Sequence, residues 1–126
     1  MKRLSLLTIL TMALTPVPLL AQTGAAGTWT ASFETQIGVQ DYTYVFEVDG
    51  MTLTGTAKSS MSETPSAIRD GKIEGNTLTF VENLNYQGME LVITYKGTLA
   101  GDEIRFTRMV GEFATEELTA KRAETQ

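Results

Sequence analysis

From Gly27 onward, apolar and polar residues alternate with a period of two along most of the chain. Successive residues of a strand point to opposite sides, so this pattern predicts strands that bury one face and expose the other. Threonine, valine, tyrosine and phenylalanine, which suit a pleated surface, are frequent in these runs. The alternating apolar or glycine positions are Trp29, Ala31, Phe33, Tyr42, Tyr44, Phe46, Val48, Met51, Leu53, Gly55, Ala57, Ile73, Leu78, Phe80, Met89, Leu91, Ile93, Tyr95, Gly97, Leu99, Ile104, Phe106, Leu118 and Ala120.

The breaks between these runs have the chemistry of hairpin turns. Asp49-Gly50, Gly75-Asn76 and Gly101-Asp102 each separate two alternating runs, and such pairs tolerate the positive φ of a two-residue loop. Looser breaks at 38–41, 59–65, 85–88 and 110–112 carry the glycine, serine, asparagine or proline of loops. Residues 115–122 have the composition of a helix but no continuous apolar stripe, so they favour a strand.

One hairpin pattern occurs twice. Residues 71–80 and 97–106, offset by 26 positions, both read Gly, any, aliphatic, any, Gly, Asn or Asp, any, aliphatic, any, Phe. A solenoid is one way to stack such units. Hairpins that pair with their neighbours close more naturally as a barrel, which removes exposed strand edges. The sequence therefore predicts an all-β fold, a single antiparallel up-and-down β-barrel of about eight strands.

The first residues have the layout of a signal peptide. Met1-Lys2-Arg3 is basic, residues 4–20 carry no charge, and Leu20-Ala21 places a small residue at a cleavage position. An uncleaved membrane anchor is the alternative, but the apolar stretch is short and is interrupted by prolines. We expect residues 1–21 to be cleaved, residues 22–126 to form the barrel domain, and the protein to be exported to the periplasm or the medium.

Composition excludes several kinds of chemistry. The 126 residues include no Cys and no His, which excludes a Cys or His nucleophile, a His base, a zinc finger, disulfides and a lipoprotein cysteine. Cleavage would remove two basic residues and leave 8 basic against 15 acidic, a net charge of −7. This charge disfavours nucleic acids and anionic membranes as partners, and otherwise serves solubility. No loop has the oxygen-ligand spacing of a calcium site, and no cofactor motif is present.

A short motif at each end of the domain resembles the calycins, the group of barrels that includes lipocalins and avidins. Gly27-Thr28-Trp29 opens the first strand, and Lys121-Arg122 ends the last one. The resemblance implies that Trp29 closes one barrel end and that Arg122 packs over its indole. Leu53-Thr54-Gly55-Thr56 is also similar to avidin-type sequences, and the repeated hairpin phrases are similar to small exported bacterial domains of unknown function. The cysteine pairs of lipocalins and the biotin contacts of avidins are missing, so no ligand carries over.

Aromatic residues on the predicted inner face form the first candidate site. Tyr42, Tyr44 and Phe46 share one face of one strand, and Tyr95 lies on another strand. An eight-stranded barrel has an interior that side chains either fill or leave open for one small ligand. Our leading hypothesis is non-catalytic binding of a small apolar or amphipathic molecule among these rings at one barrel mouth. A filled interior is the alternative, and the shortness of the predicted strands favours it.

Two charged residues fall on the apolar register. Glu82 lies two residues after Phe80, and Arg108 lies two residues after Phe106, so they form a candidate pair inside the barrel or at its mouth. The alternative is that both are solvated at strand ends. A second functional hypothesis is a protein-interaction or inhibitor module that uses the acidic surface and loops such as 59–65. An enzyme would need carboxylates such as Glu82, but no catalytic motif is present, so we expect no catalysis.

Overall fold

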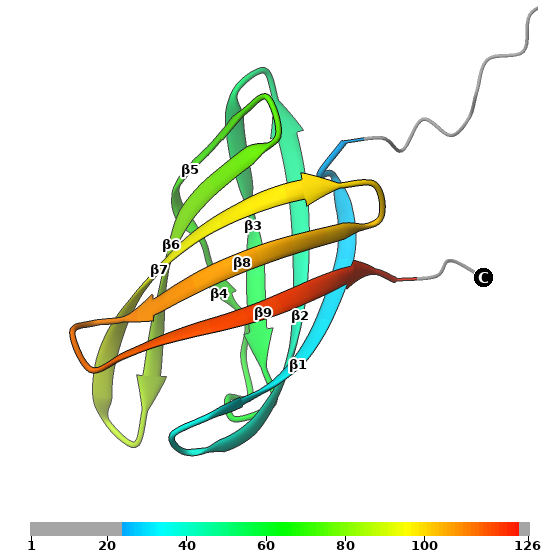
Figure 1. Ribbon diagram of the computed structural model, residues 1–126. Coiled ribbons are helices and arrows are strands. Elements are labelled where there is room, and N and C mark those ends of the chain that lie inside the picture. Colours follow the sequence, from blue (N-terminus) through cyan, green and yellow to red (C-terminus); the bar gives the residue numbers. More distant parts are fainter. Residues whose placement is uncertain (1–23, 124–126) are drawn as a thin grey trace, which may run out of the picture.

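The computed structural model describes residues 24–123, which form strands and turns (Figure 1). The signal peptide predicted over residues 1–21 lies outside the described residues. Between residues 24 and 123, no helix is long and apolar enough to cross a membrane. The strands are β1 (Gly27–Thr35), β2 (Gly38–Asp49), β3 (Thr52–Ser59), β4 (Ser66–Ala67), β5 (Arg69–Glu74), β6 (Thr77–Tyr86), β7 (Met89–Ala100), β8 (Glu103–Val110) and β9 (Ala114–Arg122).

The strands close into an antiparallel up-and-down barrel. Each long strand pairs with its neighbour in the chain, and β9 returns to pair with β1 through Trp29 opposite Arg122. The short β4 and the longer β5 both pair with β3, so together they form one interrupted wall and the barrel has eight walls. The predicted all-β, eight-stranded barrel is therefore confirmed, including a strand rather than a helix at the C-terminus.

The predicted alternation sets the inside and the outside of the barrel. On β2, for example, Tyr42, Tyr44 and Phe46 are buried and the residues between them are exposed. Three positions predicted on the alternating face are exposed instead: Val48 at 38%, Met51 at 60% and Met89 at 57%. They lie at strand ends or turns, where the wall extends past the packed core and no neighbouring side chain covers it.

The repeated hairpin is present as β5–β6 and β7–β8. Gly75-Asn76 and Gly101-Asp102 are the two-residue turns, with glycine φ angles of 61° and 66°. The first turn is one residue later than predicted, because Asp49 ends β2 and Gly50-Met51 forms the loop. The loop predicted at 38–41 is wrong, because these residues belong to β2 and the turn lies at 36–37. The loop predicted at 85–88 is shorter, since β6 continues to Tyr86.

The end of the barrel where β1 begins, at the top of Figure 1, is sealed by side chains. Trp29 is fully buried there, and its Nε1 donates to the backbone oxygen of Ala25 at 2.9 Å. The guanidinium of Arg122 lies 4.4 Å from the centroid of the indole. Arg122 also donates to the backbone oxygens of Gly24 and Ala26, at 2.9 and 3.1 Å. The two residues that the calycin resemblance assigned to closure are thus in contact at this end.

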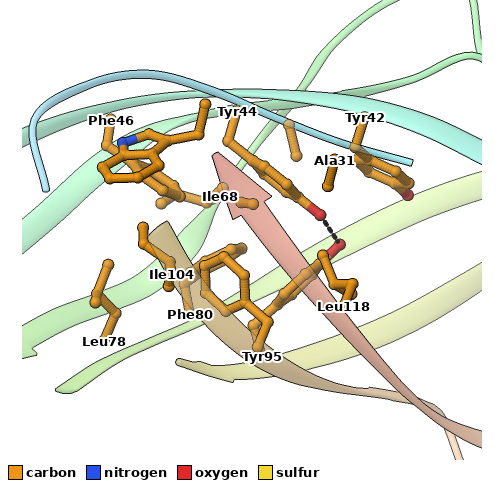
Figure 2. Close-up of a cluster of buried hydrophobic side chains, with 14 of the residues drawn as sticks. Ala31, Tyr42, Tyr44, Phe46, Ile68, Leu78, Phe80, Tyr95, Ile104 and Leu118 are labelled. Atoms are coloured by element: carbon orange, nitrogen blue, oxygen red, sulfur yellow. Dashed lines mark hydrogen bonds between the residues drawn. The ribbon is translucent and has the colours of Figure 1, made fainter. Parts of the chain in front are cut away.

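Aromatic rings fill the middle of the barrel (Figure 2). Tyr44 is at the centre, 5.3 Å from Tyr42, 5.8 Å from Phe46 and 5.7 Å from Tyr95 between ring centroids. Phe80 stacks on Tyr95 at 4.4 Å. Such offset and edge-to-face pairs stabilise a core beyond the area they bury. The core thus blocks the barrel between its sealed end and its opposite end.

Candidate functional site

The four aromatic residues predicted to bind a ligand belong to this filled layer. Tyr44 and Tyr95 are fully buried, and Tyr42 and Phe46 are 1% exposed. Their rings pack against one another and leave no described cavity between them. The predicted binding layer is therefore occupied by side chains, as in the alternative of a filled interior.

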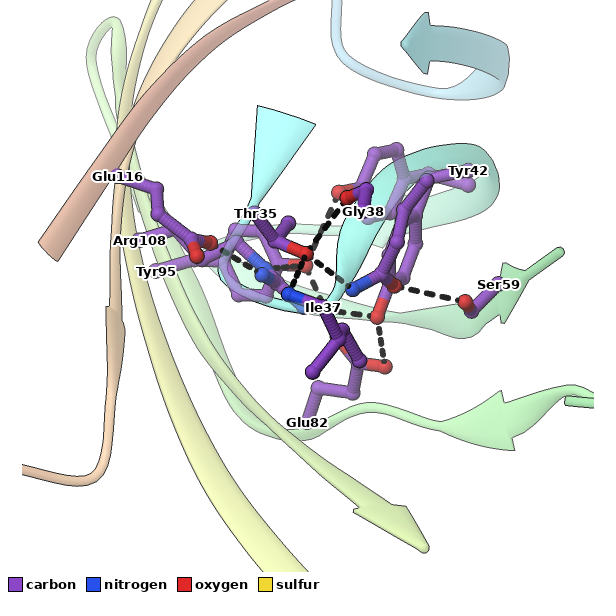
Figure 3. Close-up of polar contacts among 11 residues, drawn as sticks. Thr35, Ile37, Gly38, Tyr42, Ser59, Glu82, Tyr95, Arg108 and Glu116 are labelled. Atoms are coloured by element: carbon purple, nitrogen blue, oxygen red, sulfur yellow. Dashed lines mark hydrogen bonds and ion pairs between the residues drawn. The ribbon is translucent and has the colours of Figure 1, made fainter. Parts of the chain in front are cut away.

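Glu82 and Arg108 lie inside the barrel, next to the aromatic layer, and two tyrosines connect them (Figure 3). Tyr42 Oη donates to Glu82 Oε2 at 2.8 Å, and Tyr95 Oη donates to Glu82 Oε1 at 2.9 Å. On the other side of the same phenols, Arg108 Nη2 donates to Tyr42 Oη and Arg108 Nε donates to Tyr95 Oη, each at 2.9 Å. Two phenols therefore bridge the predicted pair, and neither member is solvated at a strand end.

The hydroxyl protons of this buried cluster can all be assigned. The protons of Tyr42 and Tyr95 point at Glu82, so both carboxyl oxygens are acceptors. Tyr44 Oη lies 3.0 Å from Tyr95 Oη and is the donor, because the proton of Tyr95 is already directed elsewhere. A protonated Glu82 would bring a fourth proton to the three contacts among Glu82, Tyr42, Tyr95 and Tyr44, so one hydroxyl of the cluster would lack an acceptor within it. The bonds therefore describe a Glu82 carboxylate facing an Arg108 guanidinium across two neutral phenols.

Burial shifts the pKa values of the cluster. It raises the pKa of Glu82 above its ordinary 4.5, although the hydrogen bond from Tyr42 and the charge of Arg108 act in the opposite direction. Burial also raises the pKa of Tyr42, Tyr44 and Tyr95, so the phenols stay neutral. Burial alone would lower the pKa of Arg108, but the tyrosines and Glu82 more than offset this and raise it. These shifts leave the guanidinium charged and the phenols protonated.

Sequence reasoning missed a third charged residue, Glu116. Its Oε1 accepts from Arg108 Nη1, and its side chain is 12% exposed. Glu116 lies opposite Arg108 in the β8–β9 register. The signal was present in the sequence, because Glu116 falls two residues before Leu118 and therefore on the inward face of β9. Gln40 was missed in the same way: it lies two residues before Tyr42 and is 2% exposed.

A cavity of about 260 Å³ lies at the unsealed end, beyond Arg108 and Glu116. The β1–β2, β6–β7 and β8–β9 hairpins surround it (bottom of Figure 1). Arg108 is the one residue of the predicted binding set that lines it. Its polar lining is Thr35, Gln36, Gln40, Arg108 and Glu116, and its apolar lining is Ile37, Leu84, Met89, Leu91, Ile93, Val110, Phe113 and Ala114.

The cavity thus lies one layer nearer the open end than the predicted site. On β2 the inward positions are Gln40, Tyr42, Tyr44 and Phe46 in order from the open end, and only Gln40 reaches the cavity. The four predicted rings are excluded because Arg108 and Glu116 form a floor between them and the open end. We define this end of the barrel, with its apolar walls and charged floor, as the mouth.

The loop at 59–65, considered above as part of an interaction surface, is held by hydrogen bonds beside the mouth. Ser59 is buried, and its hydroxyl donates to Gln40 Oε1 at 2.8 Å. Lys58 Nζ donates to the backbone oxygen of Ser62 at 2.6 Å. No residue of this loop is among those described as lining the cavity. Its visible role is to hold Gln40 in place at the edge of the floor.

Within residues 24–123, no three acidic side chains converge in a way that would hold a metal ion. The acidic turn at Asp102-Glu103 makes ion pairs instead. Asp102 Oδ1 accepts from Arg122 Nε at 2.9 Å, and Glu103 Oε2 lies 3.9 Å from Lys121 Nζ. These contacts join the turn to β9 at the sealed end of the barrel.

Comparison with known proteins assigns no family to the chain. No family model matches it, and no curated protein matches it significantly.

Proposed function

We propose that this protein is an exported, calycin-like barrel that binds a small amphipathic molecule in the mouth without transforming it. The observation that carries the proposal is a cavity of about 260 Å³ with apolar walls above a charged floor. Such a cavity with a few polar groups is the usual form of a small-molecule site. The apolar part of the ligand packs against Leu84, Leu91 and Val110, and its polar group faces Arg108 and Glu116.

The apolar walls set the scale of affinity. Each methylene group that leaves water contributes about 0.8 kcal/mol, so a ligand with about seven buried methylenes gains about 6 kcal/mol. Immobilisation of the ligand offsets part of this gain. We expect dissociation constants in the micromolar to millimolar range for simple amphiphiles.

Two further observations support the calycin-like and non-catalytic parts of the proposal. The closed meander with Trp29 under Arg122 is the arrangement that the resemblance implied. Glu82, the carboxylate that an enzyme would have used, is fully buried and does not line the cavity. A ligand in the mouth has no access to it, and Glu116, the carboxylate among the described lining residues, is paired with Arg108. This arrangement favours binding over catalysis.

The binding proposal is tested with a neutral apolar dye, N-phenylnaphthylamine, whose emission rises in apolar surroundings. We expect the protein to enhance the emission, and we expect Leu91→Trp to abolish the enhancement because the indole fills the cavity. Val92→Trp is the matched control, since Val92 is the next residue on β7 and is 48% exposed on the outer face. Absence of enhancement, or an equal effect of the two substitutions, would contradict the proposal.

Export is tested separately. Protein recovered from the envelope or medium of the producing cell should have the intact mass of residues 22–126, which begins at Gln22. Recovery of the full-length chain from the cytosol alone would exclude the proposed cleavage and the export.

The rim of the mouth favours one alternative, a protein partner. Phe113 is 69% exposed and Met89 is 57% exposed, and large exposed apolar groups are typical of interaction surfaces. A partner that covers the rim would lose affinity in Phe113→Ser and keep it in Leu91→Trp, whose added bulk lies inside the cavity. A small ligand requires the opposite result for Leu91→Trp. Capture of exported proteins on the immobilised barrel, repeated with both variants, separates the two functions.

A further inference from the structure

We infer that the mouth selects amphipathic cations, with the ammonium or similar group of the ligand beside Glu116. The inference rests on the proposed function, because it names the ligand class of the same cavity. It follows from the balance of buried charge below the cavity, from the hydrogen bonds of Arg108, and from the charges around the open end.

The buried cluster is electrically balanced without Glu116. Glu82 accepts a hydrogen bond at each of its two oxygens, and each donor phenol accepts in turn from Arg108. This bonding requires Glu82 as a carboxylate, so one negative charge and one positive charge compensate each other across the phenols. Buried charges without such compensation are strongly disfavoured.

Glu116 therefore adds a negative charge that the cluster does not need. One of its oxygens accepts from Arg108 Nη1, and its side chain lines the cavity with 12% exposure. Arg108 is the only Lys or Arg among the described residues that line the cavity. A cation beside the second oxygen of Glu116 would pair with this surplus charge in a partly desolvated place, where charge-assisted hydrogen bonds are strong.

An anionic ligand is disfavoured at the same floor. Three of the five N–H groups of Arg108, one on each nitrogen, donate to Tyr95, Glu116 and Tyr42, so an anion could reach only the second N–H of Nη1 or Nη2. The guanidinium carbon lies 5.1 Å from the ring centroid of Phe33 and 5.0 Å from that of Tyr42, and Arg108 is 1% exposed. A carboxylate would have to approach Arg108 past the carboxylate of Glu116.

The turns around the open end also favour cations over anions, because their charged side chains are acidic. Residues 36–37, 60–65, 87–88 and 111–113 connect the strands there and contain Glu63 and Glu112 but no Lys or Arg. The ammonium of Lys58 on β3 also lies at this end, where it donates to the backbone oxygen of Ser62, so these three side chains together carry a net charge of 1 − 2 = −1. Their negative potential raises the local concentration of cations and lowers that of anions, within about 8–10 Å at physiological ionic strength.

The test compares three ligands with one alkyl chain and different head groups: octylammonium, octanol and octanoate. Calorimetric titration of the unsubstituted protein should give the tightest binding for octylammonium, at least about tenfold tighter than for octanoate, and the difference should shrink as salt is added. Glu116→Gln should weaken octylammonium about tenfold and leave octanol nearly unchanged. Glu117→Gln is the matched control, because Glu117 is the next residue and points outward with the same charge.

The outcomes separate this inference from the proposed function. Equal binding of all three ligands, or tighter binding of octanoate, would overturn the inference and leave binding in the mouth intact. Absence of binding by all three to folded protein would overturn both. The order of the head groups in the unsubstituted protein decides the question even where Glu116→Gln does not fold. A loss of octylammonium affinity that is equal in Glu116→Gln and Glu117→Gln would also overturn the inference, because it would show a general surface effect.

Discussion

Replacing Tyr95 by phenylalanine deletes one oxygen from the centre of the barrel and leaves three polar groups without that partner. Arg108 Nε and Tyr44 Oη lose an acceptor, and Glu82 Oε1 loses a donor. Tyr44→Phe deletes the same atom type from an equally buried ring but ends a single bond. Because the Tyr95 oxygen keeps its bonds to Arg108 and Glu82, the second substitution leaves no group unsatisfied.

Tyr95→Phe should therefore cost more stability than Tyr44→Phe. A buried polar group without a partner costs about 1–3 kcal/mol, whereas a typical hydrogen bond contributes about 1 kcal/mol net. Tyr95→Phe leaves three groups without a partner, but Arg108 and Glu82 keep other hydrogen bonds. We therefore expect this substitution to lower the free energy of unfolding by about 4 kcal/mol. Tyr44→Phe should cost about 1 kcal/mol. Small domains are stable by about 5–15 kcal/mol, so both variants should fold.

Urea unfolding followed by tryptophan fluorescence measures both costs, since Trp29 is the single tryptophan and is fully buried. With a slope of about 1.5 kcal/mol per molar urea, the midpoint should fall by about 2.5 M for Tyr95→Phe and by less than about 1 M for Tyr44→Phe. Costs within about 0.5 kcal/mol of each other would refute the assignment of protons in the cluster.

Three further predictions concern the core, the sealed end and pH. Gly97→Ala would place a Cβ 2.5 Å from two ring carbons of buried Phe106, so thermal unfolding should shift down by about 10 °C or more; an unchanged midpoint would contradict this close approach. Arg122→Gln removes the cation from the indole face, so the emission of Trp29 should move to longer wavelength, and an unmoved spectrum would count against the seal. Burial raises the pKa of Glu82 in the folded protein above its ordinary 4.5. As pH rises past 4.5, the unfolded chain therefore loses this proton at a lower pH than the folded protein does. The free energy of unfolding, measured relative to Glu82→Gln, should therefore fall as pH rises through that window, and a constant or rising difference would contradict the shift.

The sequence was sufficient to predict the fold because alternation and turn chemistry are local signals. The inward positions of β2 and the turns at Gly75 and Gly101 follow from residue types at short spacing. Barrel closure followed from the repeat, since paired hairpins without free edges have to close. The exposed positions Val48 and Met89 were missed because alternation assigns a side of the wall and says nothing about where the core ends.

The site was harder to predict because it depends on depth along the barrel axis. Alternation put Tyr42, Glu82 and Arg108 on the inner face, but the tilt and stagger of the strands decide which inward residues share a layer. The sequence therefore indicated the Glu82–Arg108 pair and could not indicate the two phenols between them. Glu116 gives a weaker signal than this pair, because acidic residues are typical of the solvent face and the residue two positions before it on β9, Ala114, is small and not aromatic.

The pairing of β1 with β9 also has a consequence for how the chain matures. The first and last walls meet through Trp29 and Arg122, which are 93 positions apart, so the ring cannot be completed before the final strand has been made. Contacts of such long sequence separation form late and slowly, because the intervening chain must be ordered first. A newly made chain therefore cannot form the closed barrel before β9 has been made. A chain without the closed barrel is the form that could pass through a narrow translocation pore, as the proposed export requires.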